Sequence, residues 1–141
     1  MLIILFGPPA SGKSTLLEFL ENKNYNVLDI EKLGKNYKER KENFYKKLNT
    51  KKFDVDFLFV GAADLSPDDF LGDKKSIMLL PNKKIYKKRL FERKYKTKQN
   101  GLFKYDKFKK WSIFFDGFII ENNGSVEETV NKILKLIFID K

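Results

Sequence analysis

The stretch Gly7-Pro-Pro-Ala-Ser-Gly12-Lys13-Ser14 decides how this sequence is expected to fold. It follows the apolar run Leu2-Ile-Ile-Leu-Phe6, which is typical of a strand buried on both faces of a parallel sheet. It precedes residues 14–20, where leucine and phenylalanine recur at helical spacing. A strand, this turn and a helix in that order satisfy the pattern G-x-x-x-x-G-K-[ST], whose glycine-rich turn surrounds a phosphate.

The chemistry of the turn can be assigned residue by residue. Pro8 and Pro9 have no N–H group, so the amides of residues 10–15 must bind the phosphate, at a helix N-terminus whose dipole favours anions. Lys13 is expected to reach the β- and γ-phosphates of ATP, and the Ser14 hydroxyl to ligate Mg²⁺. The candidate nucleotide-binding residues of this turn are Gly7, Ala10, Ser11, Gly12, Lys13, Ser14 and Thr15.

Positive charge is concentrated in two segments. The 141 residues include 29 Lys or Arg and 19 Asp or Glu, which gives a formal net charge of +10. Residues 32–52 contain nine basic and two acidic side chains, residues 74–110 contain fifteen and two, and the rest of the chain is net acidic. This distribution favours an anionic partner such as a nucleotide or a nucleic acid. A general bias toward lysine would explain the total charge equally well.

Cysteine and histidine are absent from the sequence. Disulfides, thiol catalysis and cysteine-bound metals are therefore excluded, and catalysis must use Asp, Glu, Lys, Arg, Ser, Thr or Tyr. No stretch reaches the roughly 18 apolar residues that a membrane span requires, and residues 1–6 lack the charged start of a signal peptide. We therefore expect an intracellular, cytoplasmic protein without a membrane partner.

Short apolar runs alternate with helical patterns along the chain. The predicted strands are residues 2–6, 27–30, 57–60, 77–80 and 118–120. The predicted helices lie within residues 14–20, 32–52, 82–96 and 104–111 and from Ser125 onward, with a further helix start at Ser66. Asn100-Gly101 is expected to interrupt the helical structure between the helices predicted at residues 82–96 and 104–111. The alternation predicts one α/β domain over residues 1–141, a three-layer sandwich around a mainly parallel sheet.

The glycine-rich turn and the order of the elements resemble the P-loop NTPases. Within them they resemble the small kinases that include nucleoside monophosphate kinases, shikimate kinase and polynucleotide kinases. The resemblance covers nearly the whole chain and implies a five-stranded sheet of order 2-3-1-4-5. It also implies an acceptor-binding segment at about residues 31–52 and a lid at about residues 82–104, which coincide with the two basic segments. By the same resemblance, Asn122 in Asn122-Asn123-Gly124 borders the adenine, mainly through backbone groups.

Two carboxylates follow the second predicted strand, at the sheet edge where ligands bind. The spacing Asp29-Ile30-Glu31 resembles the D-x-D of shikimate kinase-type enzymes, where one carboxylate supports Mg²⁺ and the other holds the acceptor hydroxyl. This implies Asp29 as a catalytic base or magnesium ligand and Glu31 as an acceptor contact. An Asp29 that merely caps the next helix is the alternative interpretation. Asp64 follows the third predicted strand and resembles a Walker B carboxylate placed slightly late, or an acceptor-site residue; an ordinary loop carboxylate is the alternative interpretation.

Arginine is rare in this lysine-rich chain and occurs only as Arg40, Arg89 and Arg93. Arginine is favoured where a planar, bidentate phosphate contact is useful. The i,i+4 spacing places Arg89 and Arg93 on one helix face and resembles the R-x-x-x-R of small-kinase lids. It implies that both stabilise the transition state, unless they belong to a solvated basic face. Arg40 is a candidate for holding an acceptor phosphate.

Aromatic residues alternate with lysines over residues 104–111. Tyr105, Phe108 and Trp111 recur every three residues between Lys104, Lys107, Lys109 and Lys110. The stripe is interpreted either as a core-facing helix side or as a surface on which nucleic-acid bases stack.

Together these patterns predict an ATP-dependent phosphotransferase. It would move the γ-phosphate of Mg-ATP to a nucleoside- or nucleotide-type acceptor, at a hydroxyl. The second interpretation is a nucleic-acid kinase that phosphorylates a 5′ end or a modified-base hydroxyl in DNA, with the basic segments lining a DNA channel. The third is a nucleotide-binding switch or ATPase. It is disfavoured because no predicted strand is a run of four apolar residues ending in Asp, as a Walker B strand would be.

Overall fold

The five predicted strands form one parallel sheet in the computed structural model, which describes residues 1–49, 56–92 and 98–139. The strands are β1 (Leu2–Phe6), β2 (Val27–Asp29), β3 (Leu58–Gly61), β4 (Lys74–Leu79) and β5 (Phe118–Ile120). All neighbours pair in parallel, in the order β2-β3-β1-β4-β5. The fold class and the strand order 2-3-1-4-5 are therefore confirmed.

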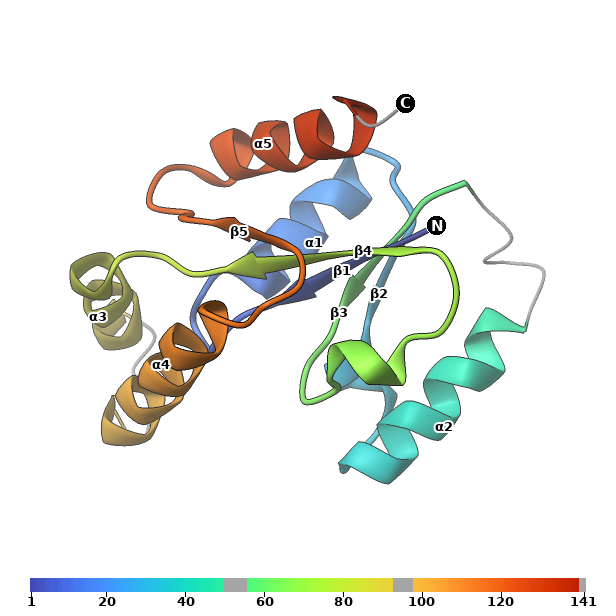
Figure 1. The fold of residues 1–141 in the computed structure, drawn as a ribbon, viewed down its shortest axis with the longest axis horizontal. Helices are drawn as coiled ribbons and strands as arrows, with labels where there is room; N and C mark the ends of the chain where they lie inside the picture. The colour runs from blue at the N-terminus through green and yellow to red at the C-terminus, as the bar shows by residue number, and fades with distance from the viewer. Residues whose placement is uncertain (50–55, 93–97, 140–141) are drawn as a thin grey trace.

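Helices cover both faces of this sheet (Figure 1). The α-helices are α1 (Lys13–Asn22), α2 (Tyr37–Leu48), α3 (Lys83–Glu92), α4 (Lys98–Ser112) and α5 (Val126–Ile139), and the 3-10 helices are η1 (Ile30–Leu33) and η3 (Pro67–Asp69). Helices α1 and α5 lie on one face, whereas α2 and α4 lie on the other. No helix in the described part of the chain is long and apolar enough to cross a membrane.

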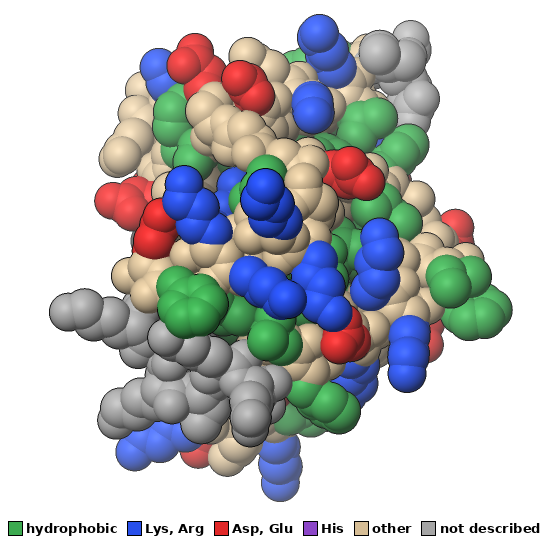
Figure 2. Space-filling model, turned by 90° about the vertical axis from the view of Figure 1, so that its left-hand side faces the viewer, with side chains coloured by type: hydrophobic (Ala, Val, Ile, Leu, Met, Phe, Trp, Pro, Cys, Tyr) green, Lys and Arg blue, Asp and Glu red, His purple; other side chains and the backbone are tan. Residues whose placement is uncertain are grey.

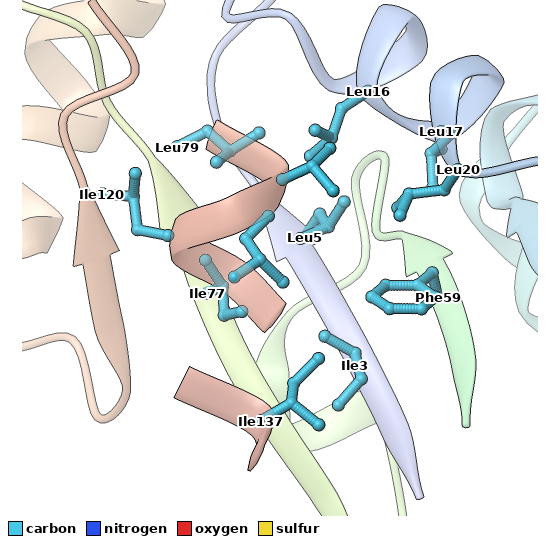
Figure 3. Packing of buried hydrophobic residues seen from close by; sticks show 12 residues of the cluster. Ile3, Leu5, Leu16, Leu17, Leu20, Phe59, Ile77, Leu79, Ile120 and Ile137 are labelled. Carbon is cyan, nitrogen blue, oxygen red and sulfur yellow. The ribbon is translucent and has the colours of Figure 1, made fainter. Parts of the chain in front are cut away.

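The central strand β1 is buried on both faces, because its successive side chains point to opposite sides of the sheet. Ile3 and Leu5 pack under α1 and α5, in the cluster that Figure 3 shows. Ile4 and Phe6 point the other way and pack with Phe44 of α2. This explains why the run before the phosphate loop contains no polar residue.

The expected break at Asn100-Gly101 is wrong, because Gly101 lies inside α4. A Cβ atom on Gly101 would lie 2.7 Å from Cδ2 of Leu90, so the missing side chain lets α3 and α4 approach closely. The Gly101 carbonyl also accepts a 3.0 Å hydrogen bond from the hydroxyl of Tyr86. Here glycine serves helix packing rather than helix termination.

Two other helices are shorter in the structure than the sequence predicts. The pattern over residues 32–52 divides into η1 and α2, with Asn36 capping α2 through a 2.9 Å hydrogen bond from the Glu39 amide. The start predicted at Ser66 leads only into the single turn η3. Part of the predicted acceptor segment, residues 50–52, and part of the predicted lid, residues 93–97, lie outside the described residues.

Candidate active site

The loop between β1 and α1 has the backbone of an anion-binding turn. Gly12 adopts a left-handed conformation with φ of 101° and directly precedes α1. The first intrahelical hydrogen bond runs from the Leu16 amide to the Gly12 carbonyl, at 2.9 Å. The amides ahead of it are those that a helix leaves for an external acceptor. The Ser11 amide is an exception, since it donates to the Pro8 carbonyl at 3.1 Å.

Three side chains of the loop bear the chemistry that the sequence predicted. The Lys13 ammonium group donates a hydrogen bond to the carbonyl of Gly7, at the start of the same loop. Ser14 and Thr15 are exposed at the first turn of α1. A lysine and a hydroxyl therefore stand at the helix start, where the phosphates of a nucleotide would bind.

Two cavities meet at this loop, and Ala10 and Gly12 line both of them. The smaller cavity has a volume of about 280 Å³ and is enclosed by the loop, the end of β4, α3 and the start of α5. The larger cavity has a volume of about 600 Å³ and extends from the loop toward η1, α2 and α4. The phosphate loop thus forms a common wall between two separate binding spaces.

Arg89 and Asn122 line the smaller cavity and connect its walls through hydrogen bonds. The Arg89 guanidinium group donates to the Asn122 carbonyl at 2.7 Å and to the Ser11 carbonyl at 3.4 Å. The Asn122 side-chain amide also donates to the Ser11 carbonyl. Burial lowers the pKa of Arg89, and the Glu92 carboxylate partly opposes this. The Ser11 carbonyl of the phosphate loop therefore joins three segments: the loop itself, α3 and the β5–α5 loop.

Two buried polar atoms at this junction have no hydrogen-bond partner among the described residues. They are Oγ of Ser11 and Oδ1 of Asn122, on residues that are 1% and 6% exposed. Unpaired buried polar atoms are costly and uncommon in folded proteins. One of these atoms lies in the loop and the other beside it, which is the arrangement expected of a site that a polar ligand completes.

The larger cavity brings the three predicted acceptor residues together. Glu31, Arg40 and Asp64 all line it, as do Lys13 and Ser14. Arg40 pairs with Asp64 at 3.2 Å and donates from Nε to the Gly34 carbonyl at 3.1 Å.

Asp29 takes a different position. It is absent from the described walls of both cavities, and its Oδ1 accepts a 3.1 Å hydrogen bond from the Glu31 amide. It thereby caps η1 and holds the backbone of Glu31, whose side chain does line the larger cavity. Arg93 lies outside the described residues. The catalytic roles of Asp29 and Arg93 stay predictions.

A buried carboxylate that the sequence interpretation missed anchors the helix that carries Arg40. Asp69 is 9% exposed and accepts hydrogen bonds from the Tyr37 hydroxyl at 2.6 Å and from the Ser66 amide at 2.9 Å. It also pairs with Lys41 at 3.0 Å. The Ser66-to-Asp69 spacing was a visible capping signal, but nothing in the sequence indicated that Tyr37 and Lys41 reach it.

The donor set of the larger cavity fits Mg²⁺. The Ser14 hydroxyl and the Glu31 and Asp64 carboxylates supply oxygen atoms, which this ion prefers. Within the described residues, no three acidic side chains converge as a ready-made metal cage. That agrees with the way Mg²⁺ binds, through one or two protein oxygens together with phosphates and water.

No family model matches the sequence, and no curated protein matches it. Solved structures resemble the fold. YorR from Bacillus subtilis, in complex with phosphorylated GDP, has a TM-score of 0.68 at 18% identity, covering 99% of this chain and 97% of YorR. Shikimate kinase from Acinetobacter baumannii, in complex with shikimate, has a TM-score of 0.67 at 18% identity, covering 99% and 94%. Deoxyadenosine kinase from M. mycoides, with dCMP and dCDP bound, has a TM-score of 0.61 at 14% identity and full coverage of both chains. The chain therefore has the fold of the small P-loop kinases.

Proposed function

We propose that this protein is an ATP-dependent phosphotransferase that moves the γ-phosphate of Mg-ATP to a hydroxyl of a nucleoside- or nucleotide-type acceptor. The observation that carries the proposal is the phosphate loop shared by two cavities. A nucleotide whose phosphates lie on this loop would have its base in one cavity and its terminal phosphate facing the other. That is the arrangement a transfer between two substrates requires.

The smaller cavity is assigned to the base of ATP. Leu16, Leu79 and Val126 give it apolar walls, and its polar side chains are Thr15, Arg89, Glu92, Asn122 and Thr129. Apolar walls combined with polar groups suit a planar heterocycle. YorR and the deoxyadenosine kinase, both of this fold, hold nucleotides, which supports this assignment.

The larger cavity is assigned to the acceptor. Under the proposal, an acceptor hydroxyl beside Glu31 attacks the γ-phosphorus, a new O–P bond forms, and the bond between the γ-phosphorus and the β–γ bridging oxygen breaks. Glu31 takes the hydroxyl proton, and ADP leaves with the electron pair. Lys13 exchanges its bond to the Gly7 carbonyl for the phosphates, while Arg89 and Arg93 offset the charge of the transition state. Asp29 keeps Glu31 in place and stays a candidate base.

Mg²⁺ bound with ATP would neutralise phosphate charge, with the Ser14 hydroxyl as its protein ligand and the Glu31 and Asp64 carboxylates as further oxygen donors on the same wall. Asp29, which the sequence predicted as a magnesium ligand, does not line this wall and stays a predicted ligand only. Because ATP is an intracellular compound, the proposal also places the protein in the cytoplasm.

The competing candidate is a kinase that acts on nucleic acid. Figure 2 shows Lys and Arg side chains gathered on the face where α3 and α4 lie, with hydrophobic side chains between them. A basic surface of this kind favours a polyanion. A labelled oligonucleotide that stays unbound at about 50 mM salt would exclude this candidate, since phosphate contacts are strongest at low salt.

The test of the proposal is a screen with radiolabelled ATP against nucleosides, monophosphates, sugars and oligonucleotides with a free 5′ hydroxyl. Wild type should label at least one of them, and Lys13→Ala should label none. Lys23→Ala removes the same charge from the far end of α1, outside both cavities, and should behave as wild type. Equal activity of Lys13→Ala and wild type would contradict the proposal.

A further inference from the structure

Helix α4 contributes one continuous stripe to the wall of the larger cavity. Lys104, Lys107, Phe108 and Trp111 all line the cavity. They are spaced i, i+3, i+4 and i+7, which is one face of an α-helix. Lys109 and Lys110 are exposed and do not line it.

Tyr105 lies beside this stripe on α4, on the side that packs against α3. It is 3% exposed, stacks on Tyr86 with ring centroids 4.6 Å apart and donates a 2.7 Å hydrogen bond to the Pro81 carbonyl. The aromatic stripe seen in the sequence is therefore divided. Tyr105 is core, whereas Phe108 and Trp111 face a binding space.

The charge of this wall is unbalanced. Within the described residues, Lys104 and Lys107 have no ion pair. The single acidic residue of α4, Asp106, pairs with Lys83 at 3.3 Å instead. Across the cavity, the charge of Arg40 is offset by Asp64 at 3.2 Å. Two uncompensated ammonium groups beside a cavity favour a ligand that carries negative charge.

The neighbouring part of the wall is aromatic. The rings of Phe108 and Trp111 have centroids 5.5 Å apart, and Trp111 also packs edge-on against Phe6 at 5.6 Å. Both residues are only partly buried. A planar apolar group can bind against such rings, because stacking on aromatic side chains stabilises a base in any sequence context.

We propose that the acceptor is a nucleotide that already carries a phosphate. Its phosphate lies at Lys104 and Lys107, its base lies against Trp111 and Phe108, and its hydroxyl faces Glu31. The proposal rests on the proposed function for the identity of the larger cavity as the acceptor side. It assigns the selection of a charged acceptor to the two lysines of α4, and the phosphate belongs either to a free mononucleotide or to the end of an oligonucleotide.

Trp111 is the single tryptophan of the chain, so its fluorescence reports binding without phosphotransfer. Without ATP, wild type should bind thymidine 3′- or 5′-monophosphate about tenfold or more tightly than thymidine, as expected of hydrogen bonds to a charged group. The double variant Lys104→Gln/Lys107→Gln should bind the monophosphates only as tightly as thymidine. The matched control Lys109→Gln/Lys110→Gln, with the same change of net charge, should keep the wild-type preference.

A wild type that binds thymidine as tightly as every phosphorylated ligand would overturn this inference, as would a control that loses the preference equally.

A trinucleotide with a 5′ hydroxyl is the last ligand of the experiment, and it distinguishes the two sources of the phosphate. Lysine-dependent binding of the trinucleotide alone would assign the phosphate to a nucleic-acid end. Transfer from ATP to a neutral acceptor without any preference for phosphate would contradict the inference alone. Lysine-dependent binding without any transfer from ATP would instead contradict the proposed function.

Discussion

The hydroxyl of Tyr37 donates a 2.6 Å hydrogen bond to Oδ1 of Asp69, thirty-two residues further along the chain. This bond joins the first turn of α2, inside the predicted acceptor segment, to η3, which lies outside that segment. Tyr45, two turns later in α2, donates its hydroxyl to the Asp69 carbonyl. Two tyrosines of the helix that carries Arg40 therefore donate to the same buried residue.

Tyr37→Phe should lower the stability of the protein. The substitution leaves the ring in place but removes a donor from a carboxylate that is largely shielded from water. We expect a lower midpoint of urea unfolding with an unchanged slope. Tyr25→Phe is the matched control, because the Tyr25 ring packs on Phe59 while its hydroxyl has no partner among the described residues. Equal losses in the two variants would contradict a special role for Tyr37.

Asp69 should make stability depend on pH. Burial on its own would raise the pKa of Asp69, but hydrogen bonds from Tyr37, Ser66 and Lys41 and the charge of Lys41 outweigh it and lower the pKa. The stabilisation is then complete above the unfolded value of about 3.9 and is lost as pH falls through the lower folded pKa. Unfolding curves from pH 7 down to pH 3 should converge for wild type and Asp69→Asn. A gap that is constant over this range would contradict the assignment.

Arg89→Lys should weaken ATP binding although it keeps the charge. Lysine cannot reproduce the fork that contacts the Ser11 and Asn122 carbonyls together. We expect KM for ATP to rise about tenfold, the equivalent of one hydrogen bond to a charged group. Lys88→Ala, an exposed neighbour on α3, should leave KM unchanged. An unchanged KM in Arg89→Lys would show that the guanidinium fork is not needed.

Asn122→Asp should destabilise the protein more than Asn122→Ala. Alanine loses the donor to the Ser11 carbonyl, at a cost of about 1–3 kcal/mol. Aspartate loses the same donor and also places a carboxylate in a position that is 6% exposed and faces a carbonyl. Chemical denaturation at pH 7 gives the order, with Asn131→Ala on the exposed side of α5 as the control. Equal stability of the two variants at Asn122 would contradict the cost of the buried carboxylate, and an Asn122→Ala variant as stable as Asn131→Ala would contradict the buried hydrogen bond.

Glu31→Gln and Asp29→Asn should separate the two candidate bases. The Glu31 side chain lines the acceptor cavity, so Glu31→Gln should lower kcat by about 10²–10⁴-fold with a binding affinity for ATP close to wild type. Asp29→Asn should cost little stability, because Asn also caps helices well. If its kcat is lost while that of Glu31→Gln persists, Asp29 is the base and the assignment is reversed.

Much of the fold could be predicted from local patterns. The run Leu2–Phe6 is apolar because the central strand of a parallel sheet is covered on both faces, and the order of the apolar runs along the chain restricts the possible topologies. The edge run Phe118–Ile120 has the same apolar pattern, although Phe118 and Ile119 are exposed in the structure. The wrong prediction at Gly101 has a tertiary cause. A glycine that ends a helix and a glycine that admits a neighbouring helix look the same in sequence, and only the position of Leu90 distinguishes them.

The sequence by itself determined the phosphate loop, because residues 7–14 are contiguous and their function depends on local backbone geometry. The tertiary structure decided the surroundings of the loop. It placed Glu31 rather than Asp29 on the cavity wall, joined Arg89 to Asn122, and turned Trp111 toward the cavity while it buried Tyr105. These relationships join segments far apart in the chain, and their geometry depends on how the helices pack on the sheet.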